Sequence, residues 1–427
     1  MDKTISPANS IRGKVRLPGD KSISHRALMI ASIAEGTTEI ENLSNGEDVL
    51  STLTCLKTLG VKIAVRGKTT VVGGKGLYGY RRSARKLDVG NSGTTIRLMS
   101  GLLAGQPFES TLTGDESIRR RPMSRIVQPL RLMGAKILAH SDEFAPLTIR
   151  GGELNPISYH LPVASAQVKS CILLAGLFAN GETCVTEPYL TRDHSERMLQ
   201  NFGAQIERNA GTVTVHGPAR LTAQHVYVPG DLSSAAFLMA AAILTTDSQV
   251  TIENAGVNPT RESFIHLLIE MGAKIEIMNF ANLNNEFFAD VVAESSDLKG
   301  IKIRGEIIPQ IIDEIPILAI LATQANGTTE IRGAAELRVK ESDRLHAISS
   351  NLQRMGAAVI EKEDGLTITG PTKLRSAEID SFHDHRIAMA FAIAGLIAEG
   401  KTLIRDAECA EVSFPGFFET LEEITIG

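Results

Sequence analysis

The sequence predicts an α/β (α+β) protein of two domains, each built from three βαβαββ repeats, and three observations support this fold class. Six short polar clusters open onto runs of small apolar residues about 70 to 80 residues apart, a period long enough for a supersecondary unit. Within the same period, a large apolar residue followed by glycine recurs, which is typical of a helix end before a strand. The length of 427 residues exceeds the usual size of one hydrophobic core.

Each polar cluster predicts the start of the first helix of a repeat. Most of the apolar runs stop at a glycine, which we expect to end the helix, and the fourth run stops at residues 245–247 instead. A helix start presents free N–H groups and partial positive charge, so it is a ready site for anions. The clusters lie at residues 21–26, 91–95, 165–167, 231–234, 313–314 and 384–386, and the glycines are Gly36, Gly105, Gly181, Gly327 and Gly400.

The second recurring signal predicts the end of a second helix, because amphipathic stretches with helical spacing precede it. A strand-like segment lies between the two helices, for example residues 37–42, and two short β-rich stretches follow the second helix. The order helix, strand, helix, strand, strand cycles to βαβαββ. The five copies of the signal are Leu59-Gly60, Met133-Gly134, Phe202-Gly203, Met271-Gly272 and Met355-Gly356.

The sixth repeat is partial, and residues 14–17 could supply its missing strand. We therefore expect an N-terminal domain of residues 20–230 and a C-terminal domain of residues 1–19 plus 231–427. The chain would cross between them near residues 18–21 and 229–234, where the turn-forming tripeptide Pro-Gly-Asp occurs twice and suits a hinge. The fourth cluster, which contains no cation, is expected to act as hinge and helix cap.

Composition excludes several classes of function. The net charge of −5 argues against a nucleic-acid binder. The N-terminus lacks the apolar core of a signal peptide, and the apolar runs are too short to span a bilayer, so we expect no membrane association. Four scattered cysteines without a CxxC pair indicate reduced thiols in a cytoplasmic protein, with neither a disulfide framework nor a zinc site.

The first polar cluster contains the strongest candidate for an anion site. Ser22 and Arg26 are four residues apart on one expected helix face, and Lys21 lies beside them. A hydroxyl, a guanidinium and an ammonium around free N–H groups form a phosphate site in type. The segment is not a P-loop, because Asp20 separates Gly19 from Lys21. A solvated, charged helix cap is the alternative.

The second cluster and the arginines behind it add a further candidate. Gly93 would let a ligand approach the backbone closely, although a plain serine or threonine cap is the alternative. Residues 119–121 are three successive arginines, which usually form a solvated surface. Arg121 precedes Pro122 and is the one best fixed to turn inward.

The fifth and sixth repeats contribute two carboxylates and three cations. Asp313 opens the first helix of the fifth repeat, and an isolated aspartate there is usually only a cap. Lys340 and Arg344 are four residues apart on one expected face of the second helix, with Glu341 on the flank, and Arg386 belongs to the sixth cluster. This combination suits anionic substrates together with general acid–base chemistry.

Taken together, these segments closely resemble the 5-enolpyruvylshikimate-3-phosphate synthase family of enolpyruvyl transferases. The resemblance covers residues 17–418 and rests on Pro-Gly-Asp-Lys-Ser-Ile-Ser-His-Arg, Asn-Ser-Gly-Thr-Thr-Ile-Arg, Lys-Glu-Ser-Asp-Arg and Asp-His-Arg. It implies the enolpyruvyl transferase fold, with three βαβαββ repeats per domain and the active site in the interdomain cleft. It also implies a monomer that needs neither an organic cofactor nor a metal.

The resemblance implies transfer of the enolpyruvyl (carboxyvinyl) group of phosphoenolpyruvate to the 5-hydroxyl of shikimate 3-phosphate, with release of phosphate, in the shikimate pathway to chorismate and the aromatic amino acids. Asp313 would accept the hydroxyl proton, and Glu341, with Lys21, would protonate the methylene carbon on the way to a tetrahedral intermediate. Shikimate 3-phosphate would be bound by Lys21, Ser22, Arg26, Ser165, Gln167, Arg192, Asp313 and Lys340. Phosphoenolpyruvate would be bound by Lys21, Gly93, Arg121, Gln167, Arg344 and Arg386.

Three positions refine the resemblance. Val412 stands where many members have a lysine, so one phosphoenolpyruvate cation is missing or comes from elsewhere. Ala166 stands where some members have a second serine, which points to the second class of these synthases. Gly93 lies where some herbicide-tolerant members carry alanine, so we expect inhibition by glyphosate.

Two alternatives remain. The sibling enolpyruvyl transferase that acts on UDP-N-acetylglucosamine uses a reactive cysteine in a loop, and the matching residues 113–121 contain no cysteine. A non-catalytic phosphate-binding repeat protein would need the cations but not Asp313 and Glu341.

Overall fold

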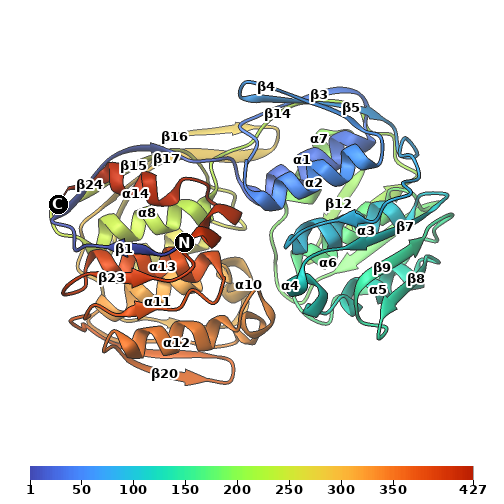
Figure 1. Cartoon of the computed structure of the whole chain (residues 1–427). Helices are drawn as coiled ribbons and strands as arrows, with labels where there is room; N and C mark the ends of the chain where they lie inside the picture. Colours follow the sequence, from blue (N-terminus) through green and yellow to red (C-terminus); the bar gives the residue numbers. More distant parts are fainter. Residues whose placement is uncertain (427) are drawn as a thin grey trace. The chain divides into compact units, whose positions relative to one another are not determined.

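The computed structural model describes residues 1–426, and the chain divides into two compact units. Unit 1 contains Met1–Pro18, Pro229–Ala281 and the chain from Phe287 onward. Unit 2 contains Gly19–Val228 and Asn282–Glu286. Figure 1 shows that helices and short sheets alternate along both units. The domain bounds expected from the sequence do not include the short segment Asn282–Glu286 in the N-terminal domain.

Unit 2 contains the first three repeats. The first repeat consists of α1 (Lys21–Ile33), β3 (Glu35–Glu41), α2 (Glu47–Thr58), β4 (Lys62–Arg66) and β5 (Thr69–Lys75). The second consists of β6 (Leu87–Asp88), α3 (Gly93–Ala104), β7 (Glu109–Thr113), α4 (Glu116–Arg120), α5 (Ser124–Leu132), β8 (Lys136–His140) and β9 (Phe144–Arg150). The third consists of β10 (Ser158–His160), α6 (Ala166–Gly176), β11 (Gly181–Thr186), α7 (His194–Asn201), β12 (Ile206–Asn209) and β13 (Thr212–Gly217), and β14 (His225–Tyr227) follows it.

Unit 1 begins with β1 (Lys3–Ile5) and β2 (Ser10–Arg16) and continues with the last three repeats. The fourth repeat consists of α8 (Leu232–Leu244), β15 (Gln249–Gly256), α9 (Ser263–Glu270), β16 (Lys274–Leu283) and β17 (Glu286–Glu294). The fifth consists of β18 (Lys302–Ile303), η1 (Gly305–Ile307), α10 (Ile308–Ile311), α11 (Ile315–Gln324), β19 (Gly327–Ile331), η2 (Ala335–Val339), α12 (Arg344–Arg354), β20 (Ala358–Lys362) and β21 (Gly365–Gly370). The sixth consists of β22 (Glu378–Ile379), α13 (His385–Leu396), β23 (Thr402–Ile404), η3 (Ala407–Val412), α14 (Phe417–Ile424) and β24 (Thr425–Ile426).

The repeats share one sheet topology. The first two strands of a repeat are parallel, as expected when a helix connects them, and the remaining pairs are antiparallel. This order confirms the predicted βαβαββ repeat. The sheets that show it in full run β6-β7-β9-β8, β10-β11-β13-β12 and β18-β19-β21-β20.

Two strands join the sheet of a different repeat from the one that contains the helix following them in sequence. β2 precedes α1 but lies parallel to β15, with Val15 opposite Ile252. β14 precedes α8 but lies parallel to β3, with Val226 opposite Ile40. Residues 12–16 of β2 therefore complete the sheet of the fourth repeat, whereas Ser10 and Ile11 of the same strand pair antiparallel with β24 of the sixth. Because residues 14–16 pair with β15, the prediction that residues 14–17 close the sixth repeat is wrong. The three-residue strand β1 pairs with β23 there, whereas the longer β2 matches the long strand β15.

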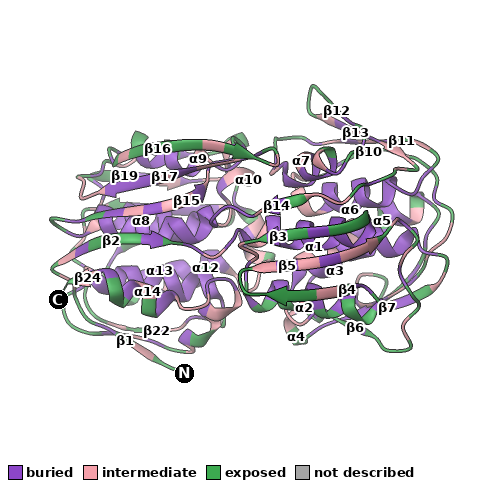
Figure 2. Cartoon of the chain, turned by 90° about the horizontal axis from the view of Figure 1, so that it is seen from above, coloured by how far each residue is buried: buried purple, intermediate pink, exposed green. Residues whose placement is uncertain are grey.

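Three helices form the centre of each unit, and the sheets pack around them. In unit 2 these helices are α1, α3 and α6, and in unit 1 they are α8, α11 and α13. Figure 2 shows α1, α3, α6, α8 and α13 almost entirely as buried residues, and all but the last residue of α11 are buried as well. Small residues allow their close packing: a Cβ at Gly101 of α3 would lie 2.2 Å from the Cys171 carbonyl oxygen of α6. Because the helix bodies are buried, their starts are the parts that can meet a ligand.

The two glycine signals have different outcomes. The five second helices end where predicted, and the glycine after each has a φ between 83° and 104°, the left-handed conformation of a helix end. Of the glycines expected to end the first helices, only Gly105 caps its helix. The other four lie a few residues beyond the helix end, at the start of the next strand or in the turn before it.

No helix among residues 1–426 is both long and apolar enough to cross a membrane.

Candidate active site

The start of α1 places two predicted residues, Lys21 and Ser22, at a capped helix N-terminus. Asp20 caps the helix by accepting a hydrogen bond from the Ile23 N–H at 2.8 Å. The Lys21 ammonium pairs with Asp48 Oδ2 at 3.1 Å, and both side chains are largely buried. Ser22 lies half-buried beside them. An ammonium and a hydroxyl at a helix start are suited to an anion.

Arg26 lies one turn along α1 and is held on three sides. Its Nη1 donates to the Ser22 carbonyl oxygen at 2.8 Å, which confirms that the two residues share a helix face. Its Nε donates to Ser195 Oγ at 2.6 Å and its Nη2 to Ser170 Oγ at 2.8 Å. Burial lowers the pKa of Arg26 to about 10, so the guanidinium stays charged at neutral pH.

His25 should make the stability of the protein depend on pH. The imidazole is buried, with Nδ1 2.7 Å from Thr52 Oγ1. Burial, helped by the charges of Lys21 and Arg26, lowers the pKa of His25 well below 6.5. Below about pH 6.5 the unfolded chain therefore binds a proton that the folded protein does not, and the free energy of unfolding should fall by up to ~1.4 kcal/mol per pH unit. We expect His25→Gln to remove this slope in urea unfolding between pH 6.5 and 5.

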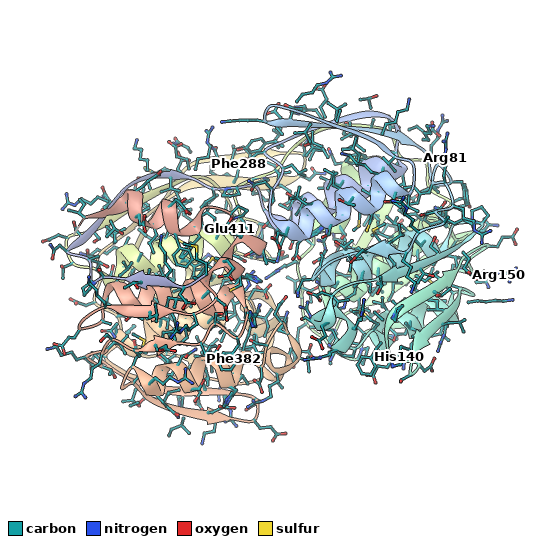
Figure 3. The ribbon with its side chains drawn as sticks, viewed as in Figure 1. Arg81, His140, Arg150, Phe288, Phe382 and Glu411 are labelled. Carbon is teal, nitrogen blue, oxygen red and sulfur yellow. The ribbon has the colours of Figure 1, made fainter. Side chains whose placement is uncertain are left out.

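The control for this prediction is His140→Gln. His140 lies exposed at the end of β8 (Figure 3), so its replacement tests the loss of a histidine as such. An unchanged slope in His25→Gln would assign the pH dependence to other groups.

The start of α3 leaves room for two guanidinium groups. Ser92 caps the helix by accepting from the Thr95 N–H at 3.1 Å, and Gly93 is the first helical residue. A Cβ on Gly93 would lie 2.8 Å from Arg97 Nη1 and 3.2 Å from Arg121 Nη1. The missing side chain therefore lets both arginines approach the helix start.

Arg121 turns inward, as predicted. Its Nη2 donates to Asn91 Oδ1 at 2.5 Å and to Ser117 Oγ at 2.9 Å, and the side chain is buried. Arg119 and Arg120 are exposed, so they form the solvated surface expected of successive arginines.

Gln167 joins the starts of α3 and α6. It accepts at Oε1 from Arg97 Nη1 at 2.7 Å and donates from Nε2 to Thr94 Oγ1 at 3.1 Å. Ser165 caps α6 by accepting from the Val168 N–H at 3.4 Å. Arg97 was not predicted as a site residue, although its position four residues after Gly93 placed it on the same helix face.

Arg192 lies half-buried in the segment between β11 and α7. Its neighbour Asp193 is paired with Arg197 Nε and Arg208 Nη1, each at 2.7 Å. The charge of Arg192 also acts to lower the pKa of Arg26, so the two cations influence one another.

Unit 2 thus gathers positive charge around the starts of α1, α3 and α6, and Asp48 offsets part of it. We call these side chains the basic group, and its members are Lys21, Arg26, Arg97, Arg121 and Arg192. Such a group suits a multiply anionic ligand, because charge-assisted hydrogen bonds from several donors can act together.

In unit 1, Asp313 meets three cations. Its Oδ1 lies 3.3 Å from Arg344 Nη1, 3.6 Å from Lys340 Nζ and 3.9 Å from Arg386 Nε. Arg386 Nη1 also donates to the Asp313 carbonyl oxygen at 2.9 Å. The structure therefore brings together a carboxylate and cations that the sequence placed in neighbouring repeats.

Two local predictions about these residues are wrong. Asp313 does not cap a helix, because Glu314 is the cap residue of α11 and Asp313 lies in the turn after α10. Lys340 and Arg344 do not share a helix face, because α12 begins at Arg344, behind the cap Asp343. Lys340 lies before that helix, and its ion pair with Asp313 brings it close to Arg344 instead.

Arg344 lies at the centre of a cluster of three carboxylates, Asp313, Glu341 and Asp384. We call these carboxylates, together with the cations that pair with them, the acidic group. Arg344 is buried, and it donates to Asp384 at 2.8 and 3.2 Å and to Glu341 Oε2 at 2.7 Å. Burial opposes its charge, yet Asp384, Glu341 and Asp313 raise the pKa of Arg344 above its usual value. Burial would likewise raise the pKa of Asp384, but Arg344 holds it below the usual value.

The sequence predicts Asp384 at the start of the first helix of the sixth repeat, which is confirmed, but does not include it among the candidate site residues. Its carboxylate is fully buried, caps α13 by accepting from the Arg386 N–H at 3.0 Å and accepts from Ser342 Oγ at 3.0 Å. The available signal was an aspartate directly before His-Arg at a helix start.

The start of α8, expected to contain no cation, receives one from another segment. Asp231 caps the helix by accepting from the Ser233 N–H at 2.8 Å. Arg261, from the stretch before α9, donates to Ser233 Oγ at 2.6 Å and lies 3.3 Å from Glu314 Oε1, with all of these groups buried. The cap was predicted correctly, and the cation was missed because its sequence position is remote.

Among residues 1–426, no group of three or more His, Cys, Asp or Glu side chains could hold a metal ion. The four cysteines are free thiols. Burial raises the pKa of Cys55 and of Cys409 to about 12, and it raises that of Cys171 well above the usual range, so these three thiols are poor nucleophiles at neutral pH.

Comparisons with known proteins agree with this chemistry. A model of the family described as EPSP synthase (3-phosphoshikimate 1-carboxyvinyltransferase) matches residues 5–421. A protein of Brevibacillus brevis named 3-phosphoshikimate 1-carboxyvinyltransferase is 53% identical over 422 residues and covers 99% of each chain. One of the same name from Synechocystis is 55% identical over 423 residues, covering 98% of this chain and 95% of that relative.

Solved structures give the same result. The EPSP synthase of Acinetobacter baumannii is 44% identical, with a TM-score of 0.89 over 100% of this chain and 98% of that chain. The enolpyruvyl transferase NikO from Streptomyces tendae has a TM-score of 0.82 at 20% identity over 99% of this chain and 96% of its own, a likeness of fold alone. With a family model that spans almost its full length and relatives at more than half identity, the chain belongs to the EPSP synthase (3-phosphoshikimate 1-carboxyvinyltransferase) family.

Proposed function

We propose that this protein transfers the enolpyruvyl group of phosphoenolpyruvate to the 5-hydroxyl of shikimate 3-phosphate and releases phosphate. The observation that supports this most is how charged side chains are arranged in each unit. Unit 2 gathers basic side chains at helix starts, and unit 1 holds a carboxylate, Asp313, among three cations. Both substrates are multiply anionic, so the basic group suits their binding. Asp313 and Glu341 are carboxylates of the kind that carry out proton transfers as general acids and bases.

Shikimate 3-phosphate is assigned to residues of α1 and of the start of α6, to Arg192 before α7, and to two residues of unit 1. The support is that Arg26 is held by Ser22, Ser170 and Ser195, which orients its guanidinium before a ligand arrives. The full set is Lys21, Ser22, Arg26, Ser165, Gln167, Arg192, Asp313 and Lys340.

Phosphoenolpyruvate is assigned to residues around the starts of α1, α3 and α6 and to two arginines of unit 1. The support in unit 2 is the approach of Arg121 to Gly93, which leaves backbone N–H groups and a guanidinium side by side. Arg344 already pairs with three carboxylates in this structure, so its role in binding phosphoenolpyruvate stays a prediction. The full set is Lys21, Gly93, Arg121, Gln167, Arg344 and Arg386.

In the proposed chemistry, the oxygen of the 5-hydroxyl attacks the central carbon of phosphoenolpyruvate, and Asp313 accepts the proton of that hydroxyl. Glu341, with Lys21, delivers a proton to the methylene carbon, which becomes a methyl group. The tetrahedral product then loses phosphate together with a proton of that methyl group, and this re-forms the carbon–carbon double bond of the enolpyruvyl group. Asp313 and Glu341 both pair with Arg344, at 3.3 and 2.7 Å, so one buried guanidinium holds the two carboxylates in a fixed relation.

The direct test is phosphate release when the protein is mixed with both substrates. We expect release with shikimate 3-phosphate and none when UDP-N-acetylglucosamine replaces it. The second expectation is supported by the stretch from Thr113 to Arg121, where α4 contains no cysteine. Folded protein that binds both substrates but releases no phosphate would favour a non-catalytic phosphate-binding protein, and release with the sugar nucleotide would favour the sibling enzyme.

Gly93→Ala should weaken phosphoenolpyruvate binding and glyphosate inhibition. The new Cβ would lie 2.8 Å from Arg97 Nη1 and 3.2 Å from Arg121 Nη1, so both guanidinium groups must move by tenths of an ångström. We expect the KM for phosphoenolpyruvate to rise about tenfold, as for the loss of one charged hydrogen bond. The inhibition constant for glyphosate should rise by a larger factor, and kinetics at varied phosphoenolpyruvate measure both.

A matched control is Gly152→Ala, in the loop after β9 of unit 2, where a Cβ meets no atom within 4 Å. This variant should leave both constants unchanged. Inhibition of Gly93→Ala that equals that of the parent protein would remove Gly93 from the inhibitor site.

We further propose that the two units are the domains of a monomeric, cytoplasmic enzyme, with the two Pro-Gly-Asp crossings as a hinge. The Asp231 N–H donates to the Pro18 carbonyl oxygen at 3.1 Å, which joins the two crossings. Size-exclusion chromatography with light scattering tests the monomer: a mass near 46 kDa is expected from the chain mass of 45.9 kDa.

A further inference from the structure

Lys169 of α6 is a fully buried lysine that the proposed chemistry does not use. Its side chain has an exposed fraction of 0%, and its ammonium pairs with Glu187 Oε2 at 3.1 Å and with Glu196 Oε1 at 2.8 Å. Both carboxylates are also buried. Removing three charged groups from water is costly, and pairing offsets that cost only in part. A cluster of this kind calls for an explanation beyond stability.

The first connection of the cluster runs to Arg192. The Lys169 ammonium donates to the Thr191 carbonyl oxygen at 3.4 Å, and Thr191 Oγ1 donates to Glu187 Oε2 at 2.6 Å. Thr191 directly precedes Arg192, and Asp193 directly follows it. Because Asp193 is fixed by two arginines at 2.7 Å each, the backbone is anchored on both sides of Arg192.

The second connection runs to Arg26. Lys169 and Ser170 are consecutive on α6, and Ser195 and Glu196 are consecutive on α7. The Lys169–Glu196 ion pair therefore holds the two helices together beside the two serines that accept hydrogen bonds from Arg26. Ser195 Oγ also donates to Ser170 Oγ at 2.7 Å, so the two serines that bond to Arg26 are bonded to each other as well.

We propose that Lys169 is a positioning residue that holds Arg26 and Arg192 in the geometry needed to bind shikimate 3-phosphate. The proposal rests on the function proposed above. Lys169 has no exposed surface, so it acts through Ser170, Thr191 and Glu196 and does not touch the substrate. Glu196 also favours the charged form of Arg26, whose pKa burial lowers, so the cluster supports that guanidinium electrostatically as well.

The test compares Lys169→Met with a variant that is destabilised elsewhere in unit 2. The control is Tyr80→Phe, which removes a buried hydrogen bond of 2.6 Å between Tyr80 and Ser32. We expect Lys169→Met to raise the dissociation constant of shikimate 3-phosphate, measured by calorimetry, about tenfold or more. The KM for phosphoenolpyruvate at saturating shikimate 3-phosphate should change by less than about twofold. Tyr80→Phe should lower the melting temperature and leave both constants unchanged.

Glu187→Gln is the second variant, and it decides the matter if Lys169→Met does not fold. It keeps the Lys169–Glu196 pair but weakens the anchor of Thr191, so it should release Arg192 alone and raise the same dissociation constant about threefold. Hydrogen exchange at residues 188–193 should rise in both variants and not in Tyr80→Phe.

The outcomes separate the two proposals. Wild-type protein that bound no shikimate 3-phosphate would overturn the proposed function and this inference with it. Wild-type binding that persisted unchanged in folded Lys169→Met, or in Glu187→Gln, would overturn the positioning role alone and leave a buried ion pair that only stabilises the fold. Weakened binding of shikimate 3-phosphate together with an equal loss for phosphoenolpyruvate would also overturn it, because the effect would then be general.

Discussion

Replacing Asp313 with asparagine is expected to slow turnover by at least about 100-fold while substrate binding persists. Asparagine keeps the size of the side chain and can still accept hydrogen bonds from Lys340, Arg344 and Arg386. It cannot accept the proton of the 5-hydroxyl, and loss of a general base lowers the rate by about 100- to 10,000-fold. We expect kcat for phosphate release to fall within that range, and the dissociation constant of shikimate 3-phosphate to rise by less than about tenfold.

Asp142→Asn provides the comparison for Asp313→Asn. Asp142 is an exposed carboxylate paired with Arg131, so its replacement removes one charge and one ion pair without touching the acidic group. Its kinetic constants should match those of the parent protein. If Asp313→Asn retained kcat within about threefold, the base would have to be another group, with Glu341 as the nearest candidate.

Replacing Arg344 with methionine is expected to cause the largest loss of stability. The side chain is buried and neutralises Asp384, which has no exposed surface, together with Glu341 and Asp313. Removing one partner of a buried ion pair leaves an uncompensated charge and costs about 3–5 kcal/mol. Urea unfolding at pH 7 should show a loss of this size. Arg120→Met, at the exposed pair with Glu116, should cost less than about 1 kcal/mol.

The pH dependence of the same variant has a definite sign. In the parent protein the pKa of Asp384 lies below its usual value of 3.8, so this carboxylate stabilises the fold above pH 3.8, and that stability is lost as pH falls through the folded-state pKa. In Arg344→Met, burial raises the pKa of Asp384 instead, so protonation at low pH relieves the buried charge. The difference in unfolding free energy between variant and parent should therefore be large at pH 7 and shrink toward pH 4.

A double variant completes this prediction. Arg344→Met with Asp384→Asn removes both the cation and its most deeply buried partner, so it should recover part of the lost stability. A double variant that is less stable than Arg344→Met by the full cost of a second site would show that the two residues act independently.

The repeat architecture was predictable because its signals are local. A glycine after Leu59 or Met271 ends a helix by adopting positive φ, and that chemistry needs no distant partner. Capping by Asp20, Ser92 and Ser165 was predictable for the same reason, since each side chain bonds to an N–H three residues away.

The errors share a different cause. Residues 14–17 were expected to close the sixth repeat, but β2 pairs with β15 in the fourth, and strand pairing depends on which sheet edge the folded chain offers. Asp313 and Lys340 were placed within helices because their spacing suits a helix start, yet the structure holds them in turns around a shared ion pair. Local spacing does not decide whether a charged residue caps a helix or meets a cation from another repeat.

The sequence by itself determined which residue types stand at each helix start, and hence the family, the fold class and most candidate substrate-binding residues. Only the tertiary structure decided how the charges pair: Arg344 with Asp384, 40 residues apart, and Lys169 with Glu187, 18 residues apart. Sequence patterns report the local conformation of the backbone, whereas ion pairs between buried groups are set by how helices and loops from different repeats pack. The positions that orient the candidate substrate-binding residues therefore emerge only from the fold.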